Sequence, residues 1–366
     1  MKNRKKIYVT RPYLPPRKIL QSYIDKVYEN GILTTNGPLV RELERKLQDY
    51  LGVRNVVAVS SGTSALEVAY KAINFKHEII TTPFSFVATT SSLVWSNLDP
   101  KFVDINYNNL TIDSSKIISE INKNTTGLVP VHVYGFPCEV ENIEAIAREY
   151  NLKTVYDAAH CFGVKFKNKS ILNFGDLSVL SFHATKLFHT IEGGAIISNS
   201  DSLAGKIRTM INFGLEEEHN VLDVGTNTKM NEFEALMGLS VLQNIKSIIQ
   251  DRKHNWNYYH DELIDLVEFP EPPEHTEWNY SYVPVVFRSS KELLQVKDKL
   301  NRNEIYPRRY FYPSLNTLRY IHSKTNCSIA QDLSQRILCL PTYYKIGDEN
   351  LSGISKIIKN SIKDVR

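Results

Sequence analysis

The chain of 366 residues lacks the cysteine and histidine spacings that mark common metal and redox sites. Its four cysteines form no C-x-x-C pair, and its ten histidines include no H-E-x-x-H motif. These spacings are the sequence signs of zinc and dithiol chemistry. We therefore expect neither a metal site nor a disulfide framework. The cysteines are Cys138, Cys161, Cys327 and Cys339.

A strong excess of one charge and a long apolar run are also missing. The 44 basic and 40 acidic residues leave a formal charge of only +4, too balanced to predict a nucleic-acid-binding surface. No apolar run approaches the length of a membrane span, and the segment after the basic residues 1–6 is too short and polar for a signal-peptide core. We therefore expect no nucleic-acid or membrane partner and a cytoplasmic location. The balance still allows a local basic pocket for an anionic small molecule.

No predicted strand is followed by G-x-G-x-x-G, which argues against an NAD-dependent Rossmann enzyme. Short apolar runs instead alternate with amphipathic stretches over about residues 55–199. This alternation predicts an α/β fold with a mainly parallel sheet covered by helices. The predicted strands are 55–59, 77–82, 101–105, 127–133, 153–157, 177–182 and 194–198, and the predicted helices include 113–121, 139–150 and 231–252.

A change in the chain after about residue 245 predicts a second domain. Pro270, Pro272 and Pro273 mark a break, and residues 282–287 have the composition of a new strand. We expect a large domain over residues 1–245, including the N-terminal segment, and a smaller C-terminal α/β domain over 246–366.

Lys186 is the most informative single residue. It lies between the predicted strand 177–182 and a Gly-Gly pair that opens the next strand. In open α/β sheets, ligands bind beyond the carboxyl ends of the strands. An amine at such a turn suits a nucleophile that forms a Schiff base with a carbonyl compound, and pyridoxal phosphate is the obvious candidate. A lysine after a strand is by itself more often a solvated surface residue, so this interpretation depends on the motifs around it.

The other requirements of pyridoxal phosphate have candidates too. Asp157 ends the predicted strand 153–157, where a carboxylate could keep the pyridine nitrogen protonated. The stretch 60–64 follows a strand and precedes a helix, so its free N–H groups, including those of Gly62 and Thr63, predict a phosphate site. Ser181 could add a hydroxyl. Taken alone, Asp157 would more often cap a helix and the serine-rich stretch would simply begin one.

Taken in order, S-S-G-T-S-A-L, T-T-P-F-S-F-V-A-T, D-A-A-H, S-F-H-A-T-K and E-G-G-A resemble the DegT/DnrJ/EryC1/StrS family of sugar aminotransferases over nearly the whole chain. The resemblance implies the fold of type I pyridoxal phosphate enzymes, with a mainly parallel seven-stranded sheet. It also implies a homodimer with two active sites at the subunit interface. Within the family, N-G-P at 36–38, P-V-H-V-Y-G at 130–135 and K-M-N-E-F at 229–233 look most like the branch acting on dTDP-4-keto-6-deoxyglucose.

The same resemblance suggests roles for single residues. Phe86 occupies the position whose ring stacks on the cofactor, although a phenylalanine alone is more often part of the core. His160 matches the residue beside the ring oxygen, and Asn227 matches an asparagine that reaches across the dimer to the cofactor phosphate. Lys186 sets this chain apart from dehydratase members, which have a histidine there. His183 and His189 flank the lysine, and we interpret both as scaffold.

For substrates, Asn36, Arg308, Arg309 and Tyr310 are the candidate contacts. The two guanidinium groups could bind a diphosphate in a fork or hold the carboxylate of the amino donor. The neighbouring aromatic residues of 306–312 could equally serve packing alone.

The predicted reaction moves an amino group from L-glutamate to dTDP-4-keto-6-deoxy-D-glucose. The product, dTDP-4-amino-4,6-dideoxy-D-glucose, would serve the synthesis of surface polysaccharide such as O-antigen. The alternatives are a 3-keto dTDP sugar, a UDP-linked 4-keto sugar, and a non-catalytic regulatory family member. Because both Lys186 and Asp157 are present, the last of these is disfavoured.

Overall fold

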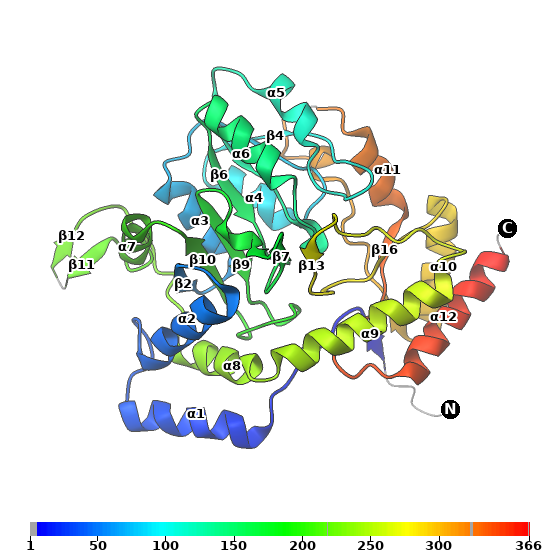
Figure 1. The fold of residues 1–366 in the computed structure, drawn as a ribbon, viewed down its shortest axis with the longest axis horizontal. Coiled ribbons are helices and arrows are strands. Elements are labelled where there is room, and N and C mark those ends of the chain that lie inside the picture. Colours follow the sequence, from blue (N-terminus) through cyan, green and yellow to red (C-terminus); the bar gives the residue numbers. More distant parts are fainter. Residues whose placement is uncertain (1–5, 218, 323–324, 365) are drawn as a thin grey trace.

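A seven-stranded sheet forms the centre of the structure, a computed structural model that describes residues 6–217, 219–322, 325–364 and 366 (Figure 1). The strand order is β2-β10-β9-β6-β5-β3-β4, and β10 alone runs antiparallel to its neighbours. This confirms the predicted α/β fold with a mainly parallel sheet. The strands are β2 (Asn55–Val59), β3 (Glu78–Thr81), β4 (Asp99–Phe102), β5 (Thr125–Val129), β6 (Lys153–Asp157), β9 (Leu177–Ser181) and β10 (Gly194–Ser198).

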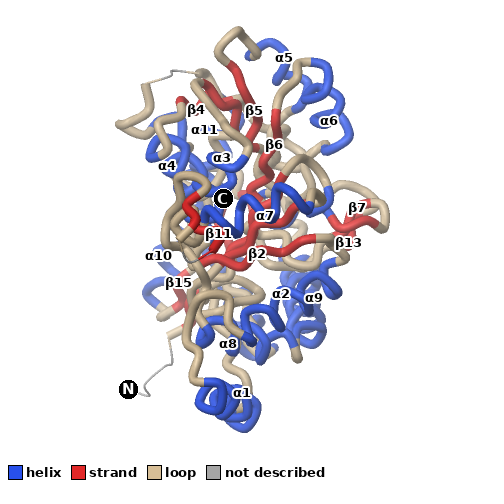
Figure 2. Tube along the Cα trace, turned by 90° about the vertical axis from the view of Figure 1, so that its left-hand side faces the viewer, coloured by secondary structure: helices blue, strands red, loops and turns tan. Residues whose placement is uncertain are grey.

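The two faces of the sheet bury separate hydrophobic clusters. Because successive side chains of a strand point to opposite faces, Val57 and Val59 of β2 join one cluster and Val56 and Ala58 join the other. Helices α3, α4 and α7 cover the first face, and α2, α6 and α8 contribute to the second cluster. Figure 2 shows α3 and α4 on one side of strands β5 and β6, with α6 on the other. Strands buried on both faces explain the continuous apolar runs in the sequence.

The helices are α1 (Arg17–Asn30), α2 (Pro38–Leu51), α3 (Gly62–Ala72), α4 (Val87–Trp95), α5 (Ile117–Glu120), α6 (Val140–Glu149), α7 (Asp201–Met210), α8 (Glu232–Leu242), α9 (Ile245–Leu263), α10 (Ser290–Arg302), α11 (Ser328–Arg336) and α12 (Asp348–Lys363). Short 3-10 turns occupy Ser114–Lys116, Val133–Gly135, Ile171–Asn173 and Leu315–Thr317. The remaining strands are β1 (Ile7–Tyr8), β7 (Lys165–Phe166), β8 (Lys169–Ser170), β11 (Leu215–Glu217), β12 (Asn220–Val221), β13 (Thr276–Glu277), β14 (Pro284–Val286), β15 (Ile305–Tyr306) and β16 (Ile337–Cys339).

The C-terminal part has a hydrophobic cluster of its own. The antiparallel pair β14 and β16 packs with α10, α12 and the second half of α9. The first described strand, β1, pairs in parallel with β15 and so joins this part of the molecule. The break between α8 and α9 falls at the predicted boundary near residue 245. The division into domains 1–245 and 246–366 stays a prediction.

Two helix predictions are wrong in detail. The single helix expected over 231–252 is two helices, because α8 ends at Leu242 and α9 starts after Asn244, a residue with low helix propensity. The helix expected over 113–121 is a 3-10 turn at Ser114–Lys116 followed by the one-turn helix α5. Serine and β-branched isoleucine make this segment a poor helix former.

The described ranges contain no helix that is long and apolar enough to cross a bilayer. Within the same ranges, no group of three or more His, Cys, Asp or Glu side chains could hold a metal ion. All four cysteines are buried and free. The basic residues 1–5, which entered the signal-peptide prediction, lie outside the described ranges.

Candidate active site

A cavity of about 420 Å³ lies at the carboxyl ends of β2, β6 and β9. This size is within the usual range for small-molecule sites. Nine of the twelve predicted site residues line it, and they come from segments far apart in the sequence. They are Gly62, Thr63, Phe86, Asp157, His160, Ser181, Lys186, Arg308 and Tyr310. The parallel sheet brings them together because its strands end at one edge.

Lys186 lies in the loop between β9 and β10, on a turn closed by its own N–H to the His183 carbonyl at 2.8 Å. Its side chain is half-buried, and Nζ donates to the hydroxyl of Tyr282 at 3.3 Å. Burial lowers the pKa of the Lys186 amine to about 8, although the charge of Asp157 acts in the opposite direction. About a tenth of this amine is therefore neutral and nucleophilic at pH 7, far more than for an ordinary lysine.

Asp157 is buried at the end of β6, with 6% of its surface exposed. Thr89 Oγ1 donates to its Oδ2 at 2.7 Å, and the Ala159 N–H donates to its Oδ1 at 3.1 Å. Burial raises the pKa of the Asp157 carboxyl, while these two hydrogen bonds and the charge of Lys186 oppose the rise. Among the described residues, no basic side chain forms an ion pair with Asp157. A cation bound in the cavity would supply the missing partner.

The predicted phosphate loop is the amino end of α3. Gly62 and Thr63 are the first residues of the helix, and Ser61 caps it by accepting from the Ser64 N–H at 3.1 Å. The first N–H groups of a helix have no acceptor within it, so they can bind an anion. A Cβ on Gly62 would lie 2.8 Å from the Ser181 Cβ, so the loop packs against β9 only with glycine at this position.

Aromatic side chains form the wall of the cavity. His160 is buried and stacks on Phe311, with ring centroids 5.7 Å apart. Its Nδ1 accepts from the Tyr134 N–H at 3.1 Å, which places the ring proton on Nε2. Burial holds the pKa of His160 well below its usual value, so the neutral ring can donate one hydrogen bond. Phe86, exposed at the start of α4, lies beside Phe311, with ring centroids 6.5 Å apart.

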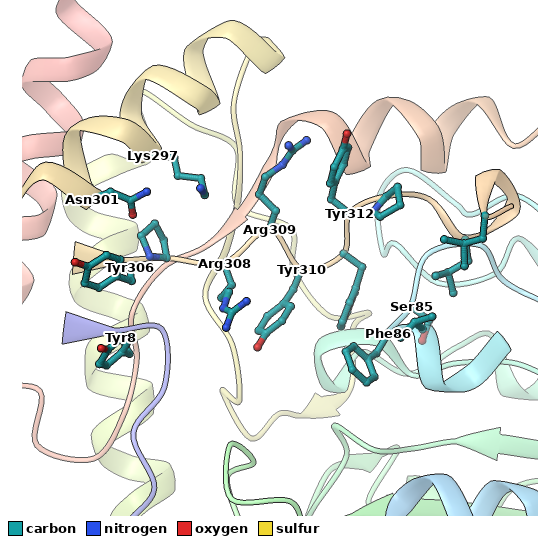
Figure 3. A pocket seen from close by; sticks show the side chains of 16 residues that line it. Tyr8, Ser85, Phe86, Lys297, Asn301, Tyr306, Arg308, Arg309, Tyr310 and Tyr312 are labelled. Atoms are coloured by element: carbon teal, nitrogen blue, oxygen red, sulfur yellow. The ribbon is translucent and has the colours of Figure 1, made fainter. Parts of the chain in front are cut away.

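Three predicted residues lie outside this cavity. Asn227 is exposed and accepts from Lys229 Nζ at 2.9 Å. Asn36 lines a different cavity of about 210 Å³. Arg309 points away from Arg308 and Tyr310 (Figure 3), and its guanidinium lies 3.5 Å from the centre of the Tyr312 ring. The two guanidinium groups therefore point to opposite sides of this extended segment, as consecutive residues of an extended chain do, and their shared role on one ligand stays a prediction.

The sequence interpretation missed three residues that support the site. Tyr282 is the hydrogen-bond partner of Lys186 but lies 96 residues further along the chain, so no local pattern could reveal it. Thr89 and Ser85 form a hydroxyl relay to Asp157, with Ser85 Oγ donating to Thr89 Oγ1 at 2.8 Å. Their spacing of four residues near the start of α4 was a usable signal.

These residues fit pyridoxal phosphate by their chemistry. Asp157 needs a cation and could bind a protonated pyridine nitrogen, and the open N–H groups of Gly62 and Thr63 could hold the phosphate. The amine of Lys186 and the Nε2–H of His160 both line the cavity. The donor set therefore matches the three requirements of this cofactor.

Comparison with known proteins points the same way. The DegT/DnrJ/EryC1/StrS aminotransferase family matches residues 17–359. A dTDP-4-amino-4,6-dideoxy-D-glucose transaminase of Shigella dysenteriae is 40% identical over 97% of this chain and 99% of its own, and one of Escherichia coli is 38% identical over the same shares. The crystal structure of DesI with its TDP-sugar product superposes with a TM-score of 0.95 at 30% identity, covering 99% of this chain and 94% of that one.

The lowered pKa of Lys186 makes a prediction for the cofactor-free protein. Because only a neutral amine attacks a carbonyl, capture of added pyridoxal phosphate should accelerate about tenfold between pH 7 and 9 and then level off. The change in absorbance after rapid mixing measures this rate, and Lys186→Ala should lack this phase. A rate that keeps climbing steeply to pH 10 would show an ordinary lysine instead.

Proposed function

Since the chain belongs to the DegT/DnrJ/EryC1/StrS aminotransferase family, we propose that it transfers an amino group from L-glutamate to dTDP-4-keto-6-deoxy-D-glucose. The product would be dTDP-4-amino-4,6-dideoxy-D-glucose, a building block for surface polysaccharide. The near full-length identity to two transaminases named for this product supports the choice. A cytoplasmic location stays a prediction.

The enzyme is a pyridoxal-phosphate-dependent aminotransferase. The observation that carries our assignment of roles is that Lys186, Asp157 and the amino end of α3 line one cavity. When bound there, pyridoxal phosphate withdraws electrons from the substrate carbon and carries the amino group between the two substrates. Lys186 would be its attachment point. Gly62, Thr63 and Ser181 would hold the phosphate, and Asp157 the ring nitrogen.

The proton moves are the task of the protein. The neutral Lys186 amine would take the proton from the α-carbon of glutamate and deliver it to the imine carbon of the cofactor. With the keto sugar it would move a proton the other way, from that cofactor carbon to the sugar carbon that receives the amino group. Its N–H bond to Tyr282 leaves the nitrogen lone pair free to accept that proton. The ionised Asp157, fixed by Thr89 and Ala159, would stabilise positive charge in the ring throughout.

Spectroscopy of the purified enzyme tests donor and acceptor in one experiment. Glutamate should change the cofactor absorption to that of pyridoxamine phosphate, and dTDP-4-keto-6-deoxy-D-glucose should reverse the change with formation of an aminated nucleotide sugar. Lys186→Ala should lower turnover at least a thousandfold and leave the fold intact, because the substitution removes both the base and the attachment point of the cofactor.

Lys165→Ala is the matched control, because Lys165 is exposed, pairs with Glu277 at 3.1 Å and is not among the residues that line the cavity. A response to glutamate without a response to this sugar would reject the acceptor and leave a 3-keto dTDP sugar or a UDP-linked 4-keto sugar. Wild-type turnover by Lys186→Ala would reject the mechanism.

We also propose that the active enzyme is a homodimer in which Asn227 completes the site of the partner subunit. Asn227 is exposed and lies outside the cavity of its own chain, although the neighbouring Thr228 is bonded to Ser60 in the phosphate loop at 2.8 Å. Nearby, β11 and β12 project from the body of the molecule (Figure 1), and β12 and the segment after it carry exposed apolar residues. They include Val221, Leu222 and Val224. Such a surface is typical of a subunit interface.

Mixing two inactive variants tests this dimer. Each hybrid dimer contains one Lys186→Ala subunit and one Asn227→Ala subunit. If each site takes Asn227 from the partner, one of its two sites is intact, because the Asn227→Ala subunit keeps its own Lys186 and receives Asn227 from the other subunit. An equimolar mixture after subunit exchange should therefore recover about a quarter of the wild-type rate. The absence of any recovery, with exchange verified by mass spectrometry, would show that Asn227 acts within its own chain or not at all.

A further inference from the structure

Among the described residues, the hydroxyl of Tyr282 is the one hydrogen-bond partner of the Lys186 amine. Nζ donates to this oxygen at 3.3 Å, and both residues line the cavity of about 420 Å³. Tyr282 is itself buried, and burial raises the pKa of its phenol, so the hydroxyl stays neutral over the range in which Lys186 titrates. Because lysine has a flexible four-carbon stem, this single contact decides where the amine lies.

The ring of Tyr282 is held by three aromatic neighbours. Its centroid lies 4.8 Å from that of His160, 5.7 Å from that of Tyr134 and 5.9 Å from that of Tyr310. These contacts are edge-to-face or tilted, as aromatic pairs prefer. They involve the ring and not the hydroxyl. A phenylalanine at this position would therefore keep the packing and remove the contact with Lys186.

The segment before Tyr282 is tied to the loop that carries His160. Asn279 is buried, and its Nδ2 donates to the carbonyl of His160 at 2.9 Å and to that of Phe162 at 3.0 Å. Its Oδ1 accepts from the N–H of Ser281 at 3.1 Å and from the hydroxyl of Ser281 at 2.8 Å. Since this loop directly follows β6, the contacts fix Tyr282 relative to the carboxyl end of that strand.

A buried guanidinium holds the same segment from the C-terminal part of the chain. Arg252 of α9 is 3% exposed, and its Nη1 donates to the carbonyl of Ser281 at 2.8 Å. The charge of Arg252 also opposes the rise in the pKa of Tyr282. The segment is therefore bonded to the sheet domain through Asn279 and to α9 through Arg252, so its geometry is set before any ligand binds.

A neutral hydroxyl suits a base that alternates between an amine and an ammonium group. Both forms of Lys186 have an N–H that can donate to the Tyr282 oxygen, and the neutral amine then keeps its lone pair for the substrate proton. A carboxylate in the same place would bind the ammonium far more strongly than the amine and would raise the pKa of the lysine. The phenol therefore orients the amine without keeping it protonated.

We propose that Tyr282 is a positioning residue that holds the Lys186 amine in place while the amine is not attached to the cofactor, with Asn279 and Arg252 acting through Tyr282. This assignment rests on the proposed function, because it presumes that Lys186 is both the attachment point and the base. It gives the C-terminal part of the chain a role in the proton transfers of the reaction.

Tyr282→Phe tests the assignment in the cofactor-free protein, where neither glutamate nor a sugar is needed. Capture of added pyridoxal phosphate is followed by rapid mixing over a range of pH. The rate on the high-pH plateau should fall about tenfold, because a hydrogen bond no longer orients the amine. The midpoint should move to lower pH, because the lost bond stabilises the ammonium form more than the amine. The variant leaves the other titratable groups of the cavity lining unchanged, namely Asp157, His160, His183, Glu192, Arg308 and Tyr310.

A role in packing alone predicts the opposite shift. A loosened cavity would admit water, the pKa of Lys186 would rise towards that of an ordinary lysine, and the midpoint would move to higher pH. Such a shift, or an unchanged plateau and midpoint, would overturn the proposal. Tyr280→Phe is the matched control, because it removes a hydroxyl from the same segment at a residue that does not line the cavity. This control should behave like the wild type.

The loaded enzyme separates positioning from substrate affinity. In Tyr282→Phe, the maximal rate of the glutamate half-reaction should fall about tenfold, while the glutamate concentration that gives half of this rate changes less than twofold. A raised half-saturating concentration with an unchanged maximal rate would place Tyr282 in substrate binding and overturn the proposal. Neither measurement uses the keto sugar, so failure of that sugar to react would reject the proposed acceptor and leave the role of Tyr282 standing.

Discussion

The interaction on which the site depends is the burial of the Asp157 carboxylate without a basic side chain as its partner. Among the described residues, Thr89 and Ala159 supply its hydrogen bonds, and neither carries a charge. Burial raises the pKa of the Asp157 carboxyl, and a bound cation would lower it again by stabilising the ionised form. Among the described residues, the carboxylate therefore has no cationic ion-pair partner, and a protonated pyridine ring would supply one. The same burial lowers the pKa of Lys186 and keeps His160 neutral.

Close packing around the phosphate loop fixes the distance between these groups. Gly62 touches β9 at Ser181, and a Cβ on Gly194 of β10 would lie 2.8 Å from the Gly62 nitrogen. A hydroxyl cluster adds to this, since Thr228 contacts both Ser60 and Ser64 at 2.8 and 2.7 Å. The loop, the strand before Lys186 and the strand after it thus form one rigid unit, as electrostatic catalysis requires.

Local sequence could predict the parts of the site that a single strand end positions. Asp157 ends a strand and Gly62 follows one, and the apolar pattern of both strands is clear, so the place of these residues at the sheet edge was predictable. The family motifs indicated the cofactor. Contacts between distant segments could not be predicted. Tyr282 meets Lys186 across 96 residues. Arg309 and Arg308 face opposite sides of an extended segment, and only the structure shows that Arg309 lies against the Tyr312 ring.

The ionisation of the cofactor ring is the most direct test of this account. Nitrogen NMR of the enzyme loaded with ¹⁵N-labelled pyridoxal phosphate reports whether the pyridine nitrogen carries a proton. We predict a protonated nitrogen in the wild type that persists to alkaline pH, and an unprotonated one in Asp157→Asn, which keeps the size of the side chain but removes its charge. An unprotonated ring in the wild type, or the same protonation state in both proteins, would contradict the role assigned to Asp157.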